Sequence, residues 1–416
     1  MNILFVVPYA PNLIRTRPYN LIRGLRQRGN LVTLVTLWEN SKELESLRQL
    51  TQEGIKVVYA RLTKARSAWN AFQALPSSIP IQAVYCWQPS LLRLLDSEIQ
   101  NQHFDVIHVE HLRGARYGLW LKSRFTQSNA RPAVIWDSVD CISYLFDQAA
   151  QSSASLFGRF VTRLELARTR HYEGWAVKQF DQVLVTSPID KNALERLAAN
   201  HNSRQESTRV DTSSIQVLPN GVDLDFFSPT NYSGEPDTLV FSGKMSYHAN
   251  VTAASYLVND IMPLVWSKRP SVRVLIVGKD PSLAIRELAT RNPERVIVTG
   301  TVSDIRPSLA RAAIAVSPVK YGAGIQNKVL EAMAMAIPVV ATAQAVSALQ
   351  VQAGEHLLVA ASPEAFAQTV LNALANPELQ HRIGQAGRRY VEQHHNWKDI
   401  SGQLEEVYTL ATKLEN

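Results

Sequence analysis

The sequence predicts an α/β protein built from two Rossmann-like, doubly wound domains. Short apolar runs alternate with longer helical stretches along the chain, a rhythm typical of parallel strands covered by helices on both faces. The rhythm restarts after Pro219-Asn220-Gly221, a turn signal near the middle of the chain. With 416 residues, of which 46% are hydrophobic and 19% charged, the chain is long enough for two such cores.

The expected strands fall into two groups, one on each side of that turn. Each is an apolar run too short for a helix. They are residues 3–7, 31–37, 57–60, 106–109, 133–136, 182–185 and 215–218, and then 238–242, 272–277, 296–299, 313–317 and 339–341. We therefore expect a first domain over 1–222 and a second over 223–396, with ligands bound outside the carboxyl ends of the strands.

Charge and cysteine content narrow the class of protein. Residues 1–222 contain 26 Lys and Arg against 18 Asp and Glu (+8), and residues 223–416 contain 17 against 18 (−1), which sum to the net charge of +7. The basic first half indicates an anionic membrane surface, a phosphorylated acceptor or nucleic acid as partner, or else a solvated basic face. Only Cys86 and Cys141 are present, far apart in apolar surroundings, which argues against disulfides or zinc and favours a reducing cytoplasm. The first apolar run is too short for a signal peptide, and no run of about 18 apolar residues predicts a membrane span.

The stretch 317–342 carries the clearest chemical signal. It reads as strand, loop, helix, proline and strand, and Gly322 and Gly324 let the loop backbone approach a ligand closely. Free N–H groups at the start of the helix form an anion site. Lys328 and Glu331 share one helix face, which suits a phosphate and a ribose; the alternative is an ordinary surface pair.

This stretch resembles the nucleotide-sugar signature of the retaining GT-B glycosyltransferases of family 4, also called group 1. Segments 217–229 (VLPNGVDLDFFSP), 241–250 (FSGKMSYHAN) and 354–359 (GEHLLV) are similar to other motifs of that family, in the same order. The resemblance covers essentially the whole chain and is greatest to the branch associated with bacterial exopolysaccharide loci. It implies two Rossmann-like domains facing a central cleft, with a last helix, about 397–416, that packs back on the first domain.

The resemblance also implies a set of donor-binding residues in the second domain. Lys244, after Gly243, stands at the position of a cation that contacts the donor diphosphate, and Glu331 at that of a carboxylate that binds ribose hydroxyls. The other donor-binding positions, of which the first four line the sugar with backbone N–H groups, are Gly322, Ala323, Gly324, Ile325 and Asn327.

The sequence departs from the family pattern at two positions. The family's first glutamate falls at Ala323, and its second diphosphate lysine falls at Ala249. We expect Lys328, on the helix above the phosphates, to replace the missing positive charge.

The first domain offers candidates for the acceptor side. The segment that ends at His111 resembles the family's histidine-bearing loop, which makes His111 the candidate active-site histidine and His108 its competitor. Where the family has a Gly-Gly loop, this chain has Arg15 and Arg17. We expect these arginines either to bind an anionic acceptor or the donor phosphate, or to be solvated charges of the loop. Two further candidate acceptor contacts, after another strand, are Asp137 and Asp140.

The resemblance implies a retaining glycosyltransferase that moves a sugar from a nucleotide-diphosphate sugar to a glycan or lipid-linked acceptor in cell-surface or exopolysaccharide synthesis. Its catalytic residues are expected to be His111, Lys244 and Lys328, with the two lysines stabilising the leaving diphosphate. No metal, no cofactor and no nucleic-acid partner are expected. We expect a cytoplasmic protein, with peripheral contact to the anionic inner face of the cell membrane through its basic half.

Two alternative functions remain from the sequence. A nucleotide-sugar 2-epimerase of the same fold needs acid and base carboxylates beside the sugar, which Ala323 does not provide. A non-catalytic protein that binds an anionic polymer would fit the basic half, but it has no use for a ribose-binding carboxylate such as Glu331.

Overall fold

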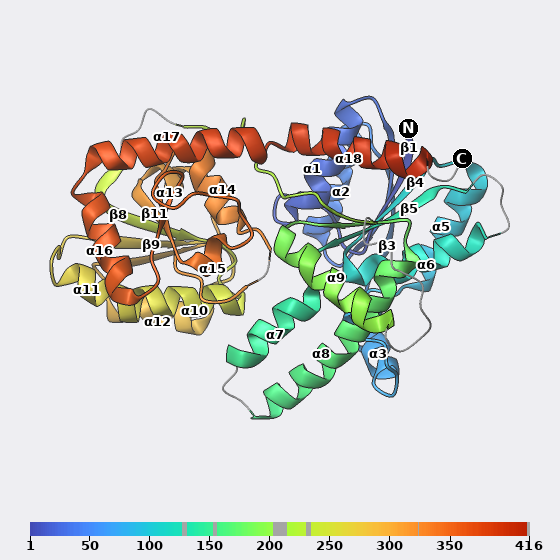
Figure 1. Ribbon diagram of the computed structural model, residues 1–416, viewed down its shortest axis with the longest axis horizontal. Coiled ribbons are helices and arrows are strands. Elements are labelled where there is room, and N and C mark those ends of the chain that lie inside the picture. Colours follow the sequence, from blue (N-terminus) through green and yellow to red (C-terminus); the bar gives the residue numbers. More distant parts are fainter. Residues whose placement is uncertain (127–130, 153–155, 203–213, 230–233, 323, 414–416) are drawn as a thin grey trace. The chain divides into compact units, whose positions relative to one another are not determined.

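The computed structural model describes residues 1–126, 131–152, 156–202, 214–229, 234–322 and 324–413. The chain forms two compact units, Met1–Pro219 with Trp397–Asn416, and Asn220–Asn396. Each unit contains one parallel β-sheet with helices packed on it (Figure 1), which confirms the predicted class of two Rossmann-like α/β units. The first segment of the first unit ends at Pro219, three residues before the predicted domain boundary at 222.

The sheet of the first unit has seven parallel strands in the order β3-β2-β1-β4-β5-β6-β7. The strand order reverses between β1 and β4, which makes the carboxyl ends of these two strands the switch point of the sheet. The strands are β1 (Asn2–Val7), β2 (Leu31–Trp38), β3 (Lys56–Arg61), β4 (Val106–Glu110), β5 (Ala133–Val139), β6 (Gln182–Val185) and β7 (Ile215–Val217).

Two apolar cores fill the two faces of this sheet. One contains side chains of α1, α2 and α18, and the other contains side chains of α5, α6, α8 and α9. The helices of the unit are α1 (Thr16–Gln27), α2 (Ser41–Gln52), α3 (Lys64–Ala74), α4 (Ile81–Val84), α5 (Pro89–Asn101), α6 (His111–Arg124), α7 (Ile142–Ser152), α8 (Leu156–Ala176), α9 (Pro188–Asn202) and α18 (Trp397–Lys413).

The last helix, α18, packs on α1 of the first unit. A Cβ atom on Gly24 of α1 would lie 2.0 Å from Ser401 Oγ, so the absence of a side chain there lets the two helices approach closely. Trp397, Leu404 and Tyr408 are buried on the same side of α18, and this burial ties the end of the chain to the first sheet.

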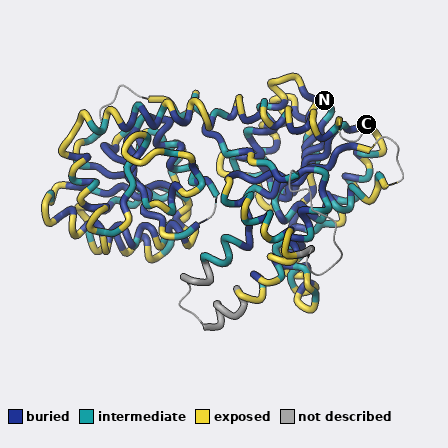
Figure 2. Tube along the Cα trace, viewed as in Figure 1, coloured by how far each residue is buried: buried dark blue, intermediate teal, exposed yellow. Residues whose placement is uncertain are grey.

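The second unit has six parallel strands in the order β10-β9-β8-β11-β12-β13, and its switch point lies between β8 and β11. In both units the strands are largely buried and the exposed residues lie mainly on helices and loops (Figure 2). The strands are β8 (Glu235–Ser242), β9 (Arg273–Val277), β10 (Val296–Gly300), β11 (Ala312–Ser317), β12 (Val339–Ala341) and β13 (Leu358–Val359). The helices are α10 (His248–Tyr256), α11 (Met262–Trp266), α12 (Leu283–Arg291), α13 (Arg306–Ala310), α14 (Asn327–Ala334), α15 (Ala343–Val346), α16 (Pro363–Leu374) and α17 (Pro377–His394).

Among the described residues, no helix combines the length and hydropathy that crossing a lipid bilayer requires.

Candidate functional site

Two loops of the second unit start at its switch point. One follows β8 and contains Gly243 and Lys244, and the other follows β11 and leads into α14. Because β8 and β11 are paired in parallel, their carboxyl ends lie side by side and the two loops meet. Ligands of open α/β sheets bind at this point, so the fold brings most of the predicted donor residues together.

Lys328 of α14 points toward the loop that follows β8. Its Nζ donates hydrogen bonds to Asn250 Oδ1 at 2.7 Å and Gln326 Oε1 at 3.3 Å. Burial lowers the pKa of this ammonium to about 8, although the nearby Glu331 raises it. A cation so weakly solvated attracts an incoming anion more strongly than an exposed lysine does.

Asn250, on α10, is the last residue of the motif 241–250, but no feature of the sequence assigned it a role in the site. Only 6% of this residue is exposed. Its Oδ1 accepts the hydrogen bond from Lys328, and its Nδ2 donates to the backbone oxygen of Lys244 at 3.0 Å. Asn250 therefore connects Lys328 of α14 with the loop that carries Lys244, the two predicted phosphate-binding lysines.

Gly243 and Gly278 leave the space that this arrangement needs. They follow the neighbouring strands β8 and β9 with φ of +145° and +147°, which side chains rarely adopt. A Cβ on Gly243 would lie 2.8 Å from Asn250 Nδ2 and 3.3 Å from Lys328 Cε, and one on Gly278 would lie 1.8 Å from the oxygen of Gly243. Any side chain at either position would displace the residues around the predicted phosphate site.

Glu331 lies one turn after Lys328 on α14. Burial raises the pKa of its carboxyl to about 7, although Lys328 lowers it. Its side chain is half-buried and makes no hydrogen bond or ion pair with any described residue. The carboxyl oxygens therefore keep their capacity to accept hydrogen bonds from ligand hydroxyls.

The loop before α14 is anchored at two points. The Tyr321 hydroxyl lies 2.8 Å from His248 Nδ1 of α10, and the two rings stack with centroids 5.4 Å apart. Gln344 Nε2 donates to the backbone oxygen of Gly322 at 2.9 Å. Contacts with His248 of α10 and with Gln344 of α15 thus fix this part of the loop without a ligand.

The remaining predicted donor-binding residues do not all have the same environment. Ala323 lies outside the described residues. Gly324 has φ of +70°, the Ile325 side chain is 8% exposed and packs in the core, and Asn327 is the first residue of α14. Ala249, where the family has a second lysine, is 3% exposed in α10, so this position offers no charge to a phosphate.

His108, one of the two candidate histidines, is a core residue. It lies within β4 with no exposed surface. Its ring stacks on Phe5 with centroids 4.0 Å apart, and its Nδ1 lies 2.8 Å from the Tyr408 hydroxyl of α18. Burial lowers its pKa, which keeps the ring neutral, and no part of it is available to a substrate.

His111 stands at the carboxyl end of β4, where α6 begins. Its φ of +66° is an unfavourable conformation for a residue other than glycine, and such strain clusters at functional sites. Burial, with a smaller effect of Arg113, lowers its pKa to about 3, so the imidazole is neutral at physiological pH. Its environment therefore favours His111 over His108 as the active-site histidine.

Tyr9 and Glu110 join the ends of β1 and β4 at the switch point of the first sheet. The Tyr9 hydroxyl donates to Glu110 Oε1 at 2.7 Å. Burial, followed by the charge of Asp137, raises the pKa of Glu110 to about 8, so this carboxyl is largely protonated at neutral pH. No spacing in the sequence marked either residue.

Arg17 and Asp137 are not placed as the predicted acceptor contacts would be. They form a buried ion pair, with Arg17 Nε 2.8 Å from Asp137 Oδ2 and side-chain exposures of 4% and 0%. Arg17 Nη1 also donates to the backbone oxygen of Leu218 at 3.0 Å. Although burial raises the pKa of Asp137, Arg17 and His108 outweigh this effect and hold it below its usual value. The pair is part of the core rather than a surface for an acceptor.

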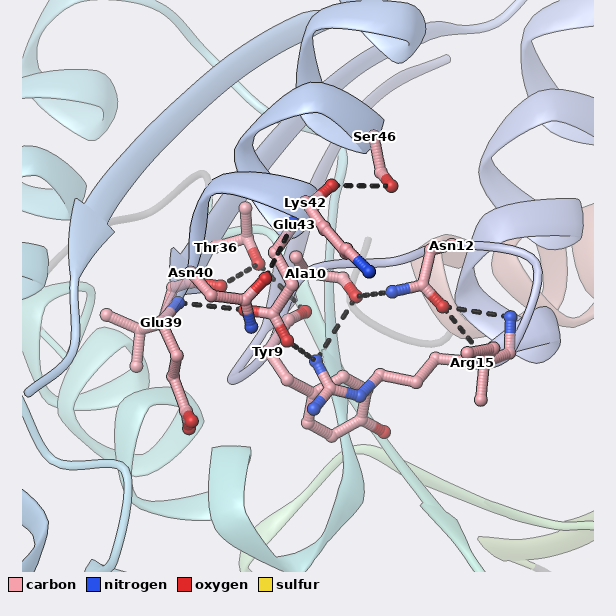
Figure 3. Close-up of polar contacts among 12 residues, drawn as sticks. Tyr9, Ala10, Asn12, Arg15, Thr36, Glu39, Asn40, Lys42, Glu43 and Ser46 are labelled. Carbon is pink, nitrogen blue, oxygen red and sulfur yellow. Dashed lines mark hydrogen bonds and ion pairs between the residues drawn. The ribbon is translucent and has the colours of Figure 1, made fainter. Parts of the chain in front are cut away.

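Arg15 retains exposed surface at the end of the loop that follows β1. Its Nη1 lies 3.1 Å from Glu43 Oε1, and 35% of its side chain is exposed. The Asn12 side chain accepts the backbone N–H of Arg15 at 3.0 Å and so shapes the loop (Figure 3). Arg15 remains a candidate contact for an anionic ligand, although its guanidinium is already paired with Glu43.

Asp140 lies just beyond the end of β5. Thr186 Oγ1 donates to its Oδ1 at 3.1 Å, and burial, followed by the charge of Asp190, raises its pKa to about 7. Asp140 is partly exposed and remains a candidate acceptor contact.

In the described part of the chain, no group of three or more His, Cys, Asp or Glu side chains is arranged to hold a metal ion. The segment Asp223-Leu224-Asp225 has the Asp-x-Asp spacing of some metal-dependent transferases. However, Asp223 Oδ1 accepts the backbone N–H groups of Asp225 at 3.2 Å and Phe226 at 2.9 Å, so this aspartate caps a turn.

Comparison with known proteins relates this site to a family. Residues 236–376, which carry every donor residue described above, match the family described as glycosyl transferases group 1. The phosphatidyl-myo-inositol mannosyltransferase of Mycobacterium tuberculosis is 26% identical over 236 residues, which are 54% of this chain and 61% of that protein. The match therefore spans less than two thirds of this relative.

Solved structures resemble the chain over almost its whole length. Sucrose-phosphate synthase from Thermosynechococcus elongatus has a TM-score of 0.69 at 17% identity, covering 99% of both chains. Anabaena HepE in complex with UDP has a TM-score of 0.66 at 15% identity, covering 98% of this chain and 100% of that one. At these identities the likeness concerns the fold, and the fold is GT-B.

Proposed function

We propose that this protein is a glycosyltransferase that transfers a sugar from a nucleotide-diphosphate sugar to a glycan or lipid-linked acceptor. The observation that carries the proposal is the cluster at the switch point of the second sheet, where Asn250 connects Lys328 with the Lys244 loop. This cluster lies inside the segment that matches the group 1 glycosyltransferases. The HepE structure with UDP and the name of the mannosyltransferase agree with a nucleotide-sugar donor.

In this proposal the second unit binds the donor. Lys328, Lys244 and the N–H groups at the start of α14 face the diphosphate, whose negative charge grows as the sugar–phosphate bond breaks. Donors that are already in place when charge develops stabilise the transition state, each by about 3 kcal/mol. Glu331 accepts hydrogen bonds from the ribose hydroxyls. We propose that these groups do this work without a metal ion, and that the sugar keeps its anomeric configuration as the family resemblance implies.

The first unit supplies the acceptor side. His111 is proposed to contact the reacting sugar or acceptor as a neutral imidazole, and Arg15 to contact an anionic acceptor. The net charge of +8 over residues 1–222 supports an acceptor linked to an anionic lipid, with the protein in the cytoplasm at the inner membrane face. We propose a role in exopolysaccharide or other cell-surface glycan synthesis on the same ground and on the family resemblance.

A donor screen tests this proposal. The purified protein is incubated with UDP-, GDP- and ADP-sugars, with and without EDTA, and thermal stability and release of nucleotide diphosphate are measured. We expect one donor to stabilise the protein and to be hydrolysed slowly, with no effect of EDTA. Glu331→Ala and Lys328→Ala should lose both responses.

The same samples separate the alternative functions. Appearance of an epimerised nucleotide sugar would identify an epimerase instead. If no donor binds, and Glu331→Ala behaves as the wild type, the protein does not use nucleotide sugars and the proposal is wrong.

A further inference from the structure

Helix α3 of the first unit has its apolar residues on the outside. Trp69 and Phe72 of α3, and Leu75 directly after its last residue, are 52%, 64% and 53% exposed, and the rings of Trp69 and Phe72 stack with centroids 6.0 Å apart. Residues three apart on a helix share one face, so these side chains form one continuous apolar strip. We call these three residues the α3 strip.

The inner face of α3 is polar instead. Ser67 and Asn70 are 3% and 4% exposed, and Asn70 Nδ2 donates to the backbone oxygen of Trp87 at 2.8 Å. Soluble helices normally bury their apolar stripe. Here the fold instead fixes the helix through polar contacts and leaves two large aromatic side chains in water, which is the mark of an interaction surface.

The charge around the α3 strip indicates its partner. No Asp or Glu occurs from residue 54 to residue 95, whereas that segment contains Lys56, Arg61, Lys64, Arg66 and Arg93. Of these cations, Lys56 is paired with a described carboxylate, that of Glu98 at 2.6 Å, and the other four are not. Arg61 and Lys64 are exposed, and neither forms an ion pair with any described acidic side chain. The strip therefore lies in a positively charged surface. Such a surface would repel a second copy of itself and attract an anionic surface.

The neighbouring helix α8 contacts the segment that leads from the end of α3 to the start of α4. Arg168 Nη2 donates to the backbone oxygen of Leu75 at 2.6 Å, and Glu165 Oε2 accepts the backbone N–H of Ile81 at 2.9 Å. Leu164, the residue before Glu165, is 47% exposed and adds a further apolar side chain on α8. Figure 1 shows α3 at the periphery of the first unit, alongside α8.

We propose that the α3 strip and its surrounding cations dock the first unit on an anionic lipid bilayer. Tryptophan and phenylalanine on one side of a helix enter the interfacial region of a membrane, while adjacent lysines and arginines bind anionic head groups. This inference deepens the proposed membrane contact, on which it rests, by assigning it to α3. It also accounts for the exposure of aromatic side chains that the donor and acceptor sites do not use.

Vesicle sedimentation with the full-length protein tests the surface. Vesicles of phosphatidylcholine alone are compared with vesicles that contain about a third phosphatidylglycerol, an anionic lipid. We expect binding to the anionic vesicles only. The double variant Trp69→Ser/Phe72→Ser should bind them more than about tenfold more weakly, and Lys64→Gln about fivefold more weakly.

Matched controls lie on the second unit. Leu283 is 74% exposed on α12, and Lys268 is an exposed lysine, so Leu283→Ser and Lys268→Gln should bind like the wild type. Trp69→Phe should keep its affinity but lose quenching by brominated lipid. Release of nucleotide diphosphate from the donor, measured without vesicles, should be the same in every variant, which separates failure of this inference from failure of the proposed function.

Three results would overturn the inference. The first is binding of Trp69→Ser/Phe72→Ser to anionic vesicles with wild-type affinity, and the second is no binding by the wild type. The third is a wild-type dimer in light scattering that the double variant converts to a monomer, because the strip would then be a protein interface.

Discussion

Among the described residues, the hydrogen-bond partners of the Lys328 ammonium are both uncharged, Asn250 and Gln326, and burial lowers its pKa to about 8. Above that pH the free protein loses the charge that we assign to diphosphate binding. Donor affinity should therefore fall as pH rises, approaching about tenfold for each pH unit well above 8. Calorimetric titration with a nucleotide diphosphate between about pH 7 and 9.5 measures this slope.

Two variants control this pH prediction. Lys328→Met should bind more weakly at neutral pH and show little dependence on pH. Asn250→Asp places a carboxylate beside the ammonium, so it should raise the pKa of Lys328 and move the loss of affinity to higher pH. An equal slope in the wild type and Lys328→Met would show that another group titrates.

The two candidate histidines predict opposite phenotypes. His111→Ala should lower transfer by more than about a hundredfold and leave nucleotide diphosphate affinity unchanged, because the nucleotide is proposed to bind the second unit. His108→Ala removes a buried ring and its contact with Tyr408, and should cost about 2–4 kcal/mol of unfolding free energy. Steady-state kinetics together with urea denaturation of both variants distinguishes these roles. A His108 variant with normal stability and no transfer would reverse the assignment.

At the scale of elements, the strands were predictable because a strand buried on both faces reads as an apolar run. β6 and β12 match the predicted ranges, whereas the other predicted strands differ at one or both ends, where burial no longer dictates residue type. The two-residue strand β13 was missed because so short a run carries no periodic signal.

The candidate site was only partly predictable, because some of its contacts are local in the sequence and others are not. The spacing of Lys328 and Glu331 within one helix is visible in the sequence. Asn250 and Glu110 act through contacts with residues 78 and 101 positions away, at Lys328 and Tyr9, and only the folded sheet brings those positions together.

Helix α7 depends on one buried carboxylate of α8. Glu173 accepts the backbone N–H groups of Ile142 and Ser143 at 2.8 and 3.0 Å, which serves the first turn of α7. Glu173→Ala leaves these buried donors without a partner and should cost about 2–4 kcal/mol. Glu173→Gln keeps one acceptor oxygen and should cost less, and urea denaturation of the pair measures the difference. Equal stability of the alanine variant and the wild type would show that water replaces the carboxylate.

At the scale of the whole molecule, the first unit accumulates carboxyl groups that resist ionisation. Burial raises the pKa of Glu110 to about 8 and those of Asp140 and Glu173 to about 7. The folded state thus holds protons that the unfolded chain releases near its ordinary carboxyl pKa values. Stability from these groups is complete below those values and is lost as pH rises through 7 to 8.

Unfolding of the first unit should therefore require less denaturant at pH 8 than at about pH 5.5. Glu110→Gln, which cannot ionise, should reduce the dependence on pH. Chemical denaturation at several pH values, followed by tryptophan fluorescence, measures this dependence. The buried Trp136 of the first unit contributes to that signal. A wild type that becomes more stable with rising pH would show that the buried histidines His108 and His111, whose pKa values burial lowers, dominate instead.

The first unit also depends on the last residues of the sequence, because Trp397–Asn416 belong to it. Helix α18 buries Trp397, Ile400, Leu404 and Tyr408 against the first sheet, whereas the second unit has its own core. Loss of a single buried leucine costs about 2–5 kcal/mol, and a whole domain is stable by only about 5–15 kcal/mol. Deletion of residues 397–416 should therefore unfold the first unit and leave the second folded.

Limited proteolysis combined with nucleotide titration tests this dependence, because the truncated protein should be cleaved throughout residues 1–219 and still bind nucleotide diphosphate. Leu404→Ala should lower stability in a graded way, and Leu410→Ala, at a position 57% exposed on the same helix, should not. If truncation left residues 1–219 protected, the first sheet would be stable without α18. The close approach of Ser401 to Gly24 would then orient the end of the chain rather than hold the unit together.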